Sequence, residues 1–151
     1  MFFIAGCAAP TRAVAPNHYE DPLWRGRLAV RIESLETRSF TAEFELSGNV
    51  QSGELTLFTP FGSTAATLSW TSETAVMRAS GDVKNFDSLN ALIKQTVGTE
   101  IPISALFAWL EGVNVSEDGW SADLTQHASG RITARRMKPE PAVELRLVLE
   151  K

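Results

Sequence analysis

The 151-residue chain has a single cysteine, Cys7, and only two histidines. One thiol cannot form a disulfide within the chain, and neither His18 nor His127 has metal-ligand spacing to a carboxylate or thiol, so we expect no metal and no cofactor. The chain also lacks the G-x-S-x-G turn of serine hydrolases and the phosphate-binding G-x-x-x-x-G-K-[ST] loop. These absences argue against an enzyme.

An excess of positive charge is missing as well. The formal net charge is −4 and the pI is about 5.2, which disfavours a nucleic-acid-binding protein. Beyond the first residues, no stretch approaches the ~18 consecutive apolar residues of a membrane-spanning helix. Hydrophobic residues make up 44% and charged residues 21% of the chain, which is ordinary for one globular domain.

The lone cysteine follows Ile4, Ala5 and Gly6, and this order is typical of a bacterial lipobox, in which the cysteine is acylated after signal cleavage. We therefore predict a truncated signal remnant over 1–6, with the true start upstream, and a single domain over 23–151. Between them, the proline-containing segment 7–22 would be the acylated cysteine and a tether. Ala8, rather than Asp, after the cysteine favours the outer membrane by analogy with other lipoproteins. The alternative is a small buried cysteine, but large apolar residues are scarce around it.

From Trp24 onward, apolar and polar residues alternate with a period of two, which is typical of strands with one buried face. The pattern predicts eight strands joined by short turns into an antiparallel meander. The expected strands cover about 28–32, 40–46, 55–57, 66–70, 74–79, 120–124, 132–134 and 143–149.

Two amphipathic helices interrupt this pattern. The first has Asp87 as a candidate N-cap, an apolar stripe over 89–96 and a stop at Gly98. The second has apolar residues at i, i+3, i+4 and i+7 over 103–110, between Pro102 and Gly112. Because both apolar stripes need a partner, we expect a curved sheet with the helices laid across its concave side as a lid.

A turn between two expected strands contains Pro60, Phe61 and Gly62. Proline at the second turn position and glycine at the fourth suit a type I turn, with Phe61 at its apex. An exposed phenylalanine gives up about 1.5–3 kcal/mol of burial free energy, so an exposed Phe61 would need a function. In the alternative, Phe61 folds back onto the end of the sheet.

The order of several motifs resembles the LolB family of outer-membrane lipoprotein receptors. They are Trp24-Arg25-Gly26-Arg27, Gly53-Glu54-Leu55 with Thr59 to Thr64, Thr99-Glu100-Ile101-Pro102 to Trp109-Leu110-Glu111-Gly112, and Gly130-Arg131-Ile132-Thr133 with 143–149. The resemblance implies a mainly β fold, an incomplete, half-open antiparallel β-barrel covered by a helical lid. It also implies a lipid-anchored protein on the periplasmic face of the outer membrane, working as a monomer.

The resemblance further implies a function. The periplasmic carrier LolA would deliver lipoproteins, whose acyl chains enter an apolar cavity before insertion among outer-membrane phospholipids. Pro60, Phe61 and Gly62 would form the insertion loop, although well-studied members carry leucine where Phe61 stands. The expected cavity and lid residues are Leu28, Val30, Phe44, Leu46, Leu55, Leu68, Trp70, Leu106, Phe107, Trp109 and Leu110. The alternative function is a structural or scaffolding envelope lipoprotein with a filled core.

Two further features allow more than one interpretation. Trp70, Trp109 and Trp120 suit either core or cavity wall, and Trp109 lies at the flank of the second helical stripe, a plausible cavity rim. The basic residues Arg131, Arg135, Arg136 and Lys138 suit either a solvated face or a contact for phospholipid heads or an acidic partner.

Overall fold

The computed structural model describes residues 23–150, so the predicted signal remnant, the acylated Cys7 and the tether lie outside the described residues. Nine strands form one antiparallel sheet in the order β6-β5-β4-β3-β2-β1-β9-β8-β7. The strands are β1 (Leu23–Glu33), β2 (Arg38–Gly48), β3 (Gly53–Phe58), β4 (Thr64–Trp70), β5 (Ala75–Ala79), β6 (Asp82–Phe86), β7 (Trp120–Asp123), β8 (Arg131–Arg136) and β9 (Ala142–Leu149).

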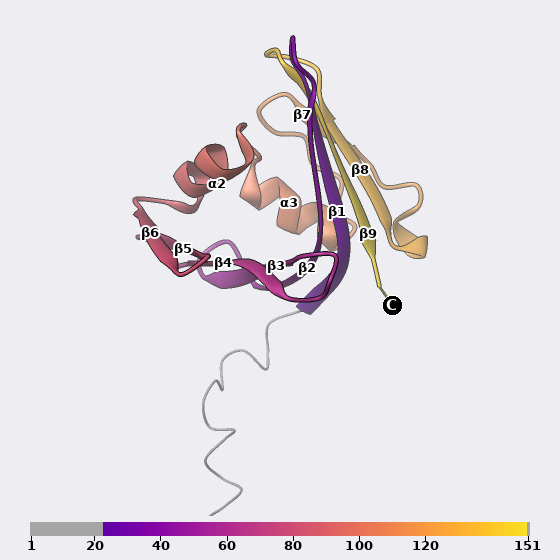
Figure 1. Cartoon of the computed structure of the whole chain (residues 1–151). Coiled ribbons are helices and arrows are strands. Elements are labelled where there is room, and N and C mark those ends of the chain that lie inside the picture. The colour runs from indigo at the N-terminus through magenta and orange to yellow at the C-terminus, as the bar shows by residue number, and fades with distance from the viewer. Residues whose placement is uncertain (1–22, 151) are drawn as a thin grey trace, which may run out of the picture.

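The sheet curls but does not close, because its end strands β6 and β7 are not paired with each other. Successive strands are neighbours from β1 to β6 and again from β7 to β9, and β9 pairs with β1. Figure 1 shows the resulting trough, with β2 to β6 below and β1, β9, β8 and β7 rising on one side. The predicted incomplete antiparallel barrel is confirmed.

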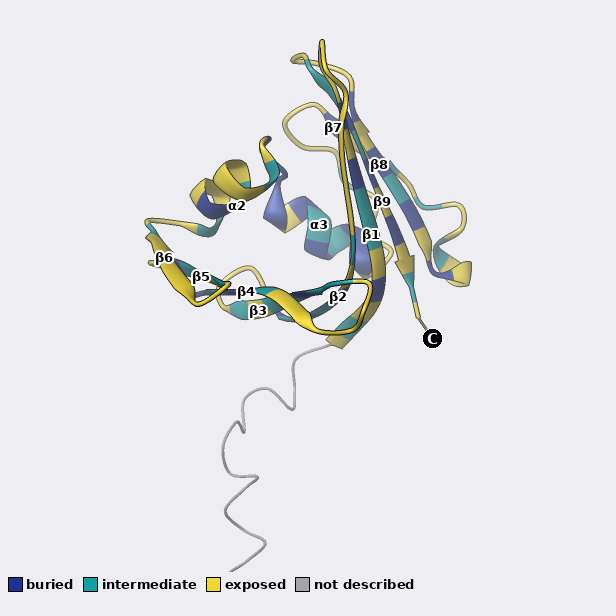
Figure 2. Cartoon of the chain, in the orientation of Figure 1, coloured by how far each residue is buried: buried dark blue, intermediate teal, exposed yellow. Residues whose placement is uncertain are grey.

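Two helices lie on the concave side of the sheet, α2 (Leu89–Val97) and α3 (Ile103–Leu110) (Figure 1). The buried residues of α3 include Phe107, Trp109 and Leu110, and Figure 2 shows this helix mostly in the colours of buried and half-buried residues. In α2 only Leu92 is fully buried, and the rest is half-buried or exposed. The helices therefore cover the sheet to different depths.

The ends of the helices follow local sequence rules. Ser88 caps α2, because its Oγ accepts a hydrogen bond of 3.1 Å from the Ala91 N–H, so the predicted cap at Asp87 was wrong by one residue. Gly98 ends α2 as predicted, with a φ of 98° that favours glycine. Pro102 precedes α3 and Gly112 follows it, as predicted.

The prediction of eight strands was wrong by one, because it omitted β6. Its sequence, Asp-Val-Lys-Asn-Phe, is exposed at four of five positions. An edge strand that buries almost nothing on either face has no alternation of polarity to reveal it. Elsewhere alternation marks the strands well: Leu28, Val30 and Ile32 of β1 share the concave face, while Arg27 and Arg31 lie exposed on the other. Among residues 23–150, no helix has the length and apolar character needed to cross a bilayer.

Candidate functional site

A small apolar cavity lies between the helices and the concave face of the sheet. Its volume is about 70 Å³, and every residue that lines it is apolar. The lining residues are Leu28, Phe44, Leu46, Leu55, Leu68, Trp70, Leu89, Ile93, Ile103, Leu106, Phe107, Leu110 and Leu147. An engineered cavity of about 150 Å³ in another protein takes up benzene, so this space is too small for an acyl chain with the helices in place.

The structure brings most of the predicted cavity residues together. Nine of them line this space: Leu28, Phe44, Leu46, Leu55, Leu68, Trp70, Leu106, Phe107 and Leu110. The sheet register explains the grouping, since Leu55 pairs with both Leu46 and Leu68, and Leu57 pairs with Phe44. These strand neighbours project the same way and form a continuous apolar wall.

Two predicted wall residues, Val30 and Trp109, do not line the cavity. Val30 lies farther along β1, where it is buried beside a shallow surface hollow with Ile32 and Phe40. Trp109 is 0% exposed and packs against Trp120 with ring centroids 6.2 Å apart, so it is not at a rim. Its Nε1 donates a hydrogen bond of 3.0 Å to the Val115 carbonyl oxygen, which fixes the ring.

Four lining residues were missing from the predicted set: Leu89, Ile93, Ile103 and Leu147. The sequence carried signals for all of them, because the first three belong to the helical stripes and Leu147 to the alternation of β9. The stripes predict which side of each helix is buried but not which residues meet the sheet. That depends on the angle at which a helix crosses the strands.

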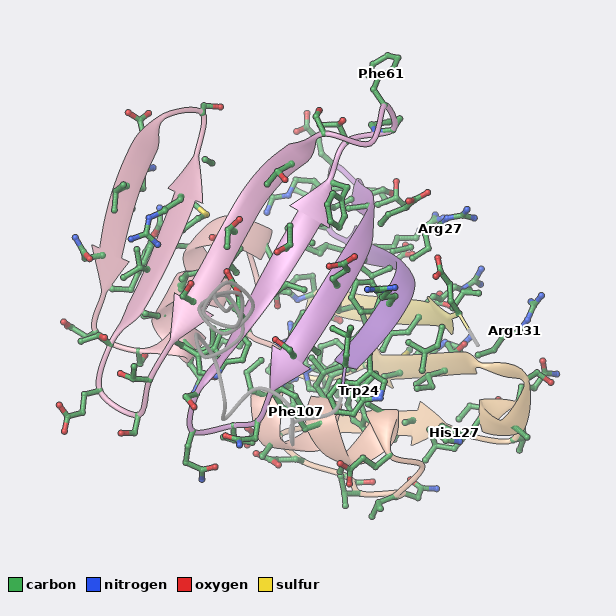
Figure 3. The ribbon with its side chains drawn as sticks, turned by 90° about the horizontal axis from the view of Figure 1, so that it is seen from below. Trp24, Arg27, Phe61, Phe107, His127 and Arg131 are labelled. Atoms are coloured by element: carbon green, nitrogen blue, oxygen red, sulfur yellow. The ribbon has the colours of Figure 1, made fainter. Side chains whose placement is uncertain are left out.

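Aromatic rings from distant parts of the chain meet at the cavity. Phe107 of α3 lies 5.7 Å from Trp24 of β1 and 6.5 Å from Trp70 of β4, measured between ring centroids, and both pairs are tilted. Figure 3 shows Trp24 and Phe107 together on the same side of the molecule. Such tilted pairs favour contact between ring edge and face. Phe107 therefore holds α3 to two separate strands.

Phe61 lies at the tip of the hairpin between β3 and β4, where its side chain is 95% exposed. Figure 3 shows it projecting beyond the sheet. The Gly62 N–H donates a hydrogen bond of 2.9 Å to the Thr59 carbonyl oxygen, and the Thr59 N–H donates one of 2.8 Å to the Ser63 carbonyl oxygen. Gly62 has a φ of 89°, as a three-residue hairpin loop ending in a left-handed residue requires.

Side-chain bonds tighten the same turn. The hydroxyls of Thr59 and Ser63 lie 2.8 Å apart in a hydrogen bond, and the Phe61 N–H donates a bond of 3.3 Å to Thr59 Oγ1. The backbone at the tip is thus fixed by four hydrogen bonds around one exposed ring. This geometry presents the phenylalanine to whatever approaches the hairpin.

A larger groove of about 600 Å³ lies beside the start of α3. Glu100, Glu117 and Arg136 line it together with apolar residues. Glu117 accepts a hydrogen bond of 2.8 Å from Ser104 Oγ. Because charged groups would lose hydration against a hydrocarbon chain, this groove suits acyl chains poorly despite its size.

One carboxylate on the outer face of the sheet, away from the cavity, pairs with two arginines. Arg146 Nε lies 2.7 Å and Arg135 Nη2 3.5 Å from Glu144 Oε2. The hydrogen bond from Arg146 is the main reason that the pKa of Glu144 falls below its usual value. In the part of the chain that the structure describes, no cluster of three or more His, Cys, Asp or Glu residues could hold a metal ion.

The family model described as outer membrane lipoprotein LolB matches residues 23–148, which is nearly all of the described domain. The chain belongs to the LolB family. The family assignment places this chain among lipoproteins of the outer membrane and supports a role as a receptor in lipoprotein localisation. The family is one of lipoprotein trafficking and is not known for catalysis.

Individual relatives agree with the family assignment. The chain is 25% identical over 171 residues to the outer-membrane lipoprotein LolB of Bordetella petrii, a match covering 97% of this chain and 86% of that protein. It is 28% identical to the LolB of Shewanella loihica over 142 residues, covering 84% of this chain and 64% of the relative. It is 30% identical to that of Shewanella sp. MR-4 over 126 residues, covering 74% and 55%.

Proposed function

We propose that this LolB-family protein accepts lipoproteins from the periplasmic carrier LolA and inserts them into the outer membrane. The observation that carries the proposal is Phe61, an aromatic ring 95% exposed on a hairpin fixed by hydrogen bonds. The two strands that this hairpin joins, β3 and β4, supply Leu55 and Leu68 to the apolar cavity. One hairpin thus joins a surface suited to a bilayer to an interior suited to acyl chains.

The interior must enlarge before it can hold cargo, because about 70 Å³ is too little for an acyl chain. The contacts favour displacement of α2 over α3. The one side-chain hydrogen bond from α2 to the sheet, within the described residues, is that from Thr96 Oγ1 to Met77 Sδ at 3.5 Å. By contrast, Trp109 ties α3 to the loop at Val115 and packs on Trp120 of β7.

Displacement of α2 exposes a wall on which acyl chains can replace the side chains of Leu89 and Ile93. Each methylene hidden from water contributes about 0.8 kcal/mol, so one chain of roughly fifteen methylenes gains roughly 12 kcal/mol. Release into water is correspondingly slow. Cargo therefore passes from groove to groove and then to the bilayer without leaving apolar surroundings, and no nucleotide is needed.

The anchor completes the proposal. Acylation of Cys7 and a tether over 7–22, both outside the described residues, would keep the domain close to the outer membrane. The protein would act as a monomer, meeting LolA on one occasion and phospholipid on the next. The tether lets one domain make both contacts in turn.

Replacing Phe61 with glutamate tests this function. Transfer from LolA to the protein should be unchanged, because Phe61 is remote from the cavity lining, whereas transfer onward to vesicles should be lost, because a charged tip cannot enter hydrocarbon. The two steps are measured separately, by co-purification of a labelled lipoprotein with the receptor and by its flotation with vesicles. Phe61→Leu is the matched control and should retain both steps. Normal onward transfer by Phe61→Glu would refute the insertion role.

The nearly filled interior favours one competing function, a structural envelope lipoprotein with a packed core. A hydrophobic fluorescent probe separates the two. A receptor whose α2 can be displaced binds the probe under native conditions and loses it to a competing lipoprotein. A permanently packed core binds no probe.

A further inference from the structure

One transverse row of the sheet starts at the base of the Phe61 hairpin. The register pairs Phe58 of β3 with Glu43 of β2, and Glu43 with Arg27 of β1. Arg27 in turn pairs with Val148 of β9, and Val148 with Arg131 of β8. Residues that face each other across neighbouring strands project to the same side of a sheet. The row therefore presents Arg27 and Arg131 on one face, on either side of Val148.

These two arginines differ from the other outward-facing arginines of their own part of the sheet, strands β1, β8 and β9. Arg25 pairs with Glu45, Arg31 with Glu33, and both Arg135 and Arg146 with Glu144. Arg27 and Arg131 are exposed and form no ion pair with any other described residue. Glu43 stands beside Arg27 in the register without forming an ion pair with it. The row thus holds two available guanidinium groups and one carboxylate.

The row also exposes an apolar side chain between the two arginines. Val148, between the arginines, is 44% exposed. Arg27 also borders a surface hollow with Phe58, Thr59 and Pro60, the residues that lead into the Phe61 tip. Figure 3 shows Phe61 projecting from one end of the sheet, and Arg27 and Arg131 pointing outward along the adjoining edge.

The spacing of these groups suits a membrane surface. Neighbouring strands are about 4.8 Å apart, so the backbones at Arg27 and Arg131 are separated by about 10 Å. The proposal requires that both guanidinium groups reach the level of the headgroups when Phe61 enters the bilayer. A guanidinium group donates two parallel hydrogen bonds to phosphate oxygens, and its aliphatic stem tolerates the boundary with the acyl chains.

We propose that Arg27 and Arg131 form, with the Phe61 tip, a contact for the phosphate groups of anionic phospholipids. The proposal rests on the insertion role of Phe61, since that role decides which flank meets the bilayer. The chain as a whole has a formal net charge of −4 and would be repelled by an anionic surface. The arginine flank therefore orients the domain, turning the Phe61 tip toward the membrane.

The test uses the full chain with Cys7→Ser, which removes the predicted acyl anchor, and vesicles of phosphatidylglycerol or of phosphatidylcholine at low salt. The variant combining Arg27→Gln and Arg131→Gln should bind phosphatidylglycerol about 25-fold more weakly, about fivefold for each arginine, and phosphatidylcholine unchanged. The control combines Arg78→Gln and Lys84→Gln, the same loss of charge on β5 and β6, and should bind as the parent does. High salt should reduce binding of the parent to the level of the arginine variant.

A Phe61→Ala arm separates this proposal from the proposed function. If Phe61→Ala loses binding to both kinds of vesicle and the arginine variant loses binding to phosphatidylglycerol alone, the insertion role of Phe61 and the anionic contact are both supported. Unchanged binding in Phe61→Ala with the arginine effect intact refutes the insertion role and keeps the anionic contact. Equal binding by the arginine variant and its control overturns the contact. It is also overturned if the arginine variant binds vesicles normally but fails to receive cargo from LolA, because the flank then contacts a protein.

Discussion

Three single residues of this protein, Phe61, Trp109 and Glu144, have very different surroundings. Phe61 touches almost nothing, so its exposure has no role in holding the fold, whereas Trp109 is completely enclosed and joined by a hydrogen bond to Val115. On the outer face, Glu144 forms ion pairs with two arginines, Arg135 and Arg146. The surroundings of Trp109 and Glu144 predict how replacing each of them changes the stability of the fold.

Trp109→Phe should destabilise the protein by about 2–3 kcal/mol. The change leaves a void beside Trp120 and removes the donor of the part-buried hydrogen bond to the Val115 carbonyl oxygen. Urea unfolding followed by circular dichroism measures the loss. Trp24→Phe is the control, because Trp24 is only half-buried and retains an aromatic ring against Phe107, and it should cost under about 1 kcal/mol. Equal losses would mean that Trp109 does not anchor α3.

Glu144→Gln should lower stability by about 0.5–1 kcal/mol at pH 7, and the difference should vanish in acid. Because Arg146 lowers the pKa of Glu144 in the folded protein, the ionised carboxylate stabilises the fold above its ordinary titration range. That contribution is lost as the pH falls through the lowered folded pKa. Unfolding free energies between pH 7 and pH 3 give the comparison. Glu43→Gln is the control, because it removes a carboxylate that forms no ion pair with any described residue, and at pH 7 it should cost less stability than Glu144→Gln.

At the scale of elements, the two helices have unequal attachments to the sheet. Two aromatic residues, Phe107 and Trp109, fix α3 to strands on both sides of the trough. α2 buries Leu92 fully but has one hydrogen bond, from Thr96 to Met77, with the strands among the residues described. Local openings favour the element with fewer buried residues, so α2 is the helix that we expect to open first.

Linking α2 to β5 should block cargo acceptance. We expect the variant with Cys7→Ser, Met77→Cys and Thr96→Cys, joined by a short bis-maleimide, to receive no lipoprotein from LolA, because α2 then stays on the cavity. The matched control joins Ser104→Cys and Glu117→Cys, whose native side chains lie 2.8 Å apart at the start of α3, and should accept cargo normally. Co-purification of labelled lipoprotein measures both. Acceptance by the first linked protein would show that α2 is not the moving part.

The limits of prediction from sequence also lie at this scale. Alternation marked the strands whose faces differ in polarity, and Gly98 marked the end of α2 by its left-handed backbone. Alternation missed β6, which buries almost nothing. The helical stripe left Trp109 open as core or as a cavity rim, and the structure buries its ring against Trp120. The small size of the cavity was also beyond prediction, since it depends on Phe107 meeting Trp24 and Trp70, residues brought together by the folded sheet.

The whole molecule is a curled sheet with functions proposed for separate regions. The concave side is apolar and covered by helices, and one hairpin carries the exposed Phe61. On the convex side of β1, β8 and β9, Arg27 and Arg131 are the arginines without an ion pair among the described residues. These regions lie apart, so cargo held in the trough as proposed would leave the hairpin tip and the two arginines open to the bilayer.

The unjoined edges of β6 and β7 have one more consequence. A closed barrel could widen only by breaking the backbone hydrogen bonds between two neighbouring strands. In this sheet β6 and β7 are not paired with each other, so the sheet can flatten with all of its strand pairs intact. Once α2 is displaced as proposed, the volume available to cargo would depend on the curvature of the sheet, because no closed wall fixes it. We therefore expect lipoproteins whose acyl chains differ in volume to fit the same protein, each flattening the sheet only as far as its own chains require.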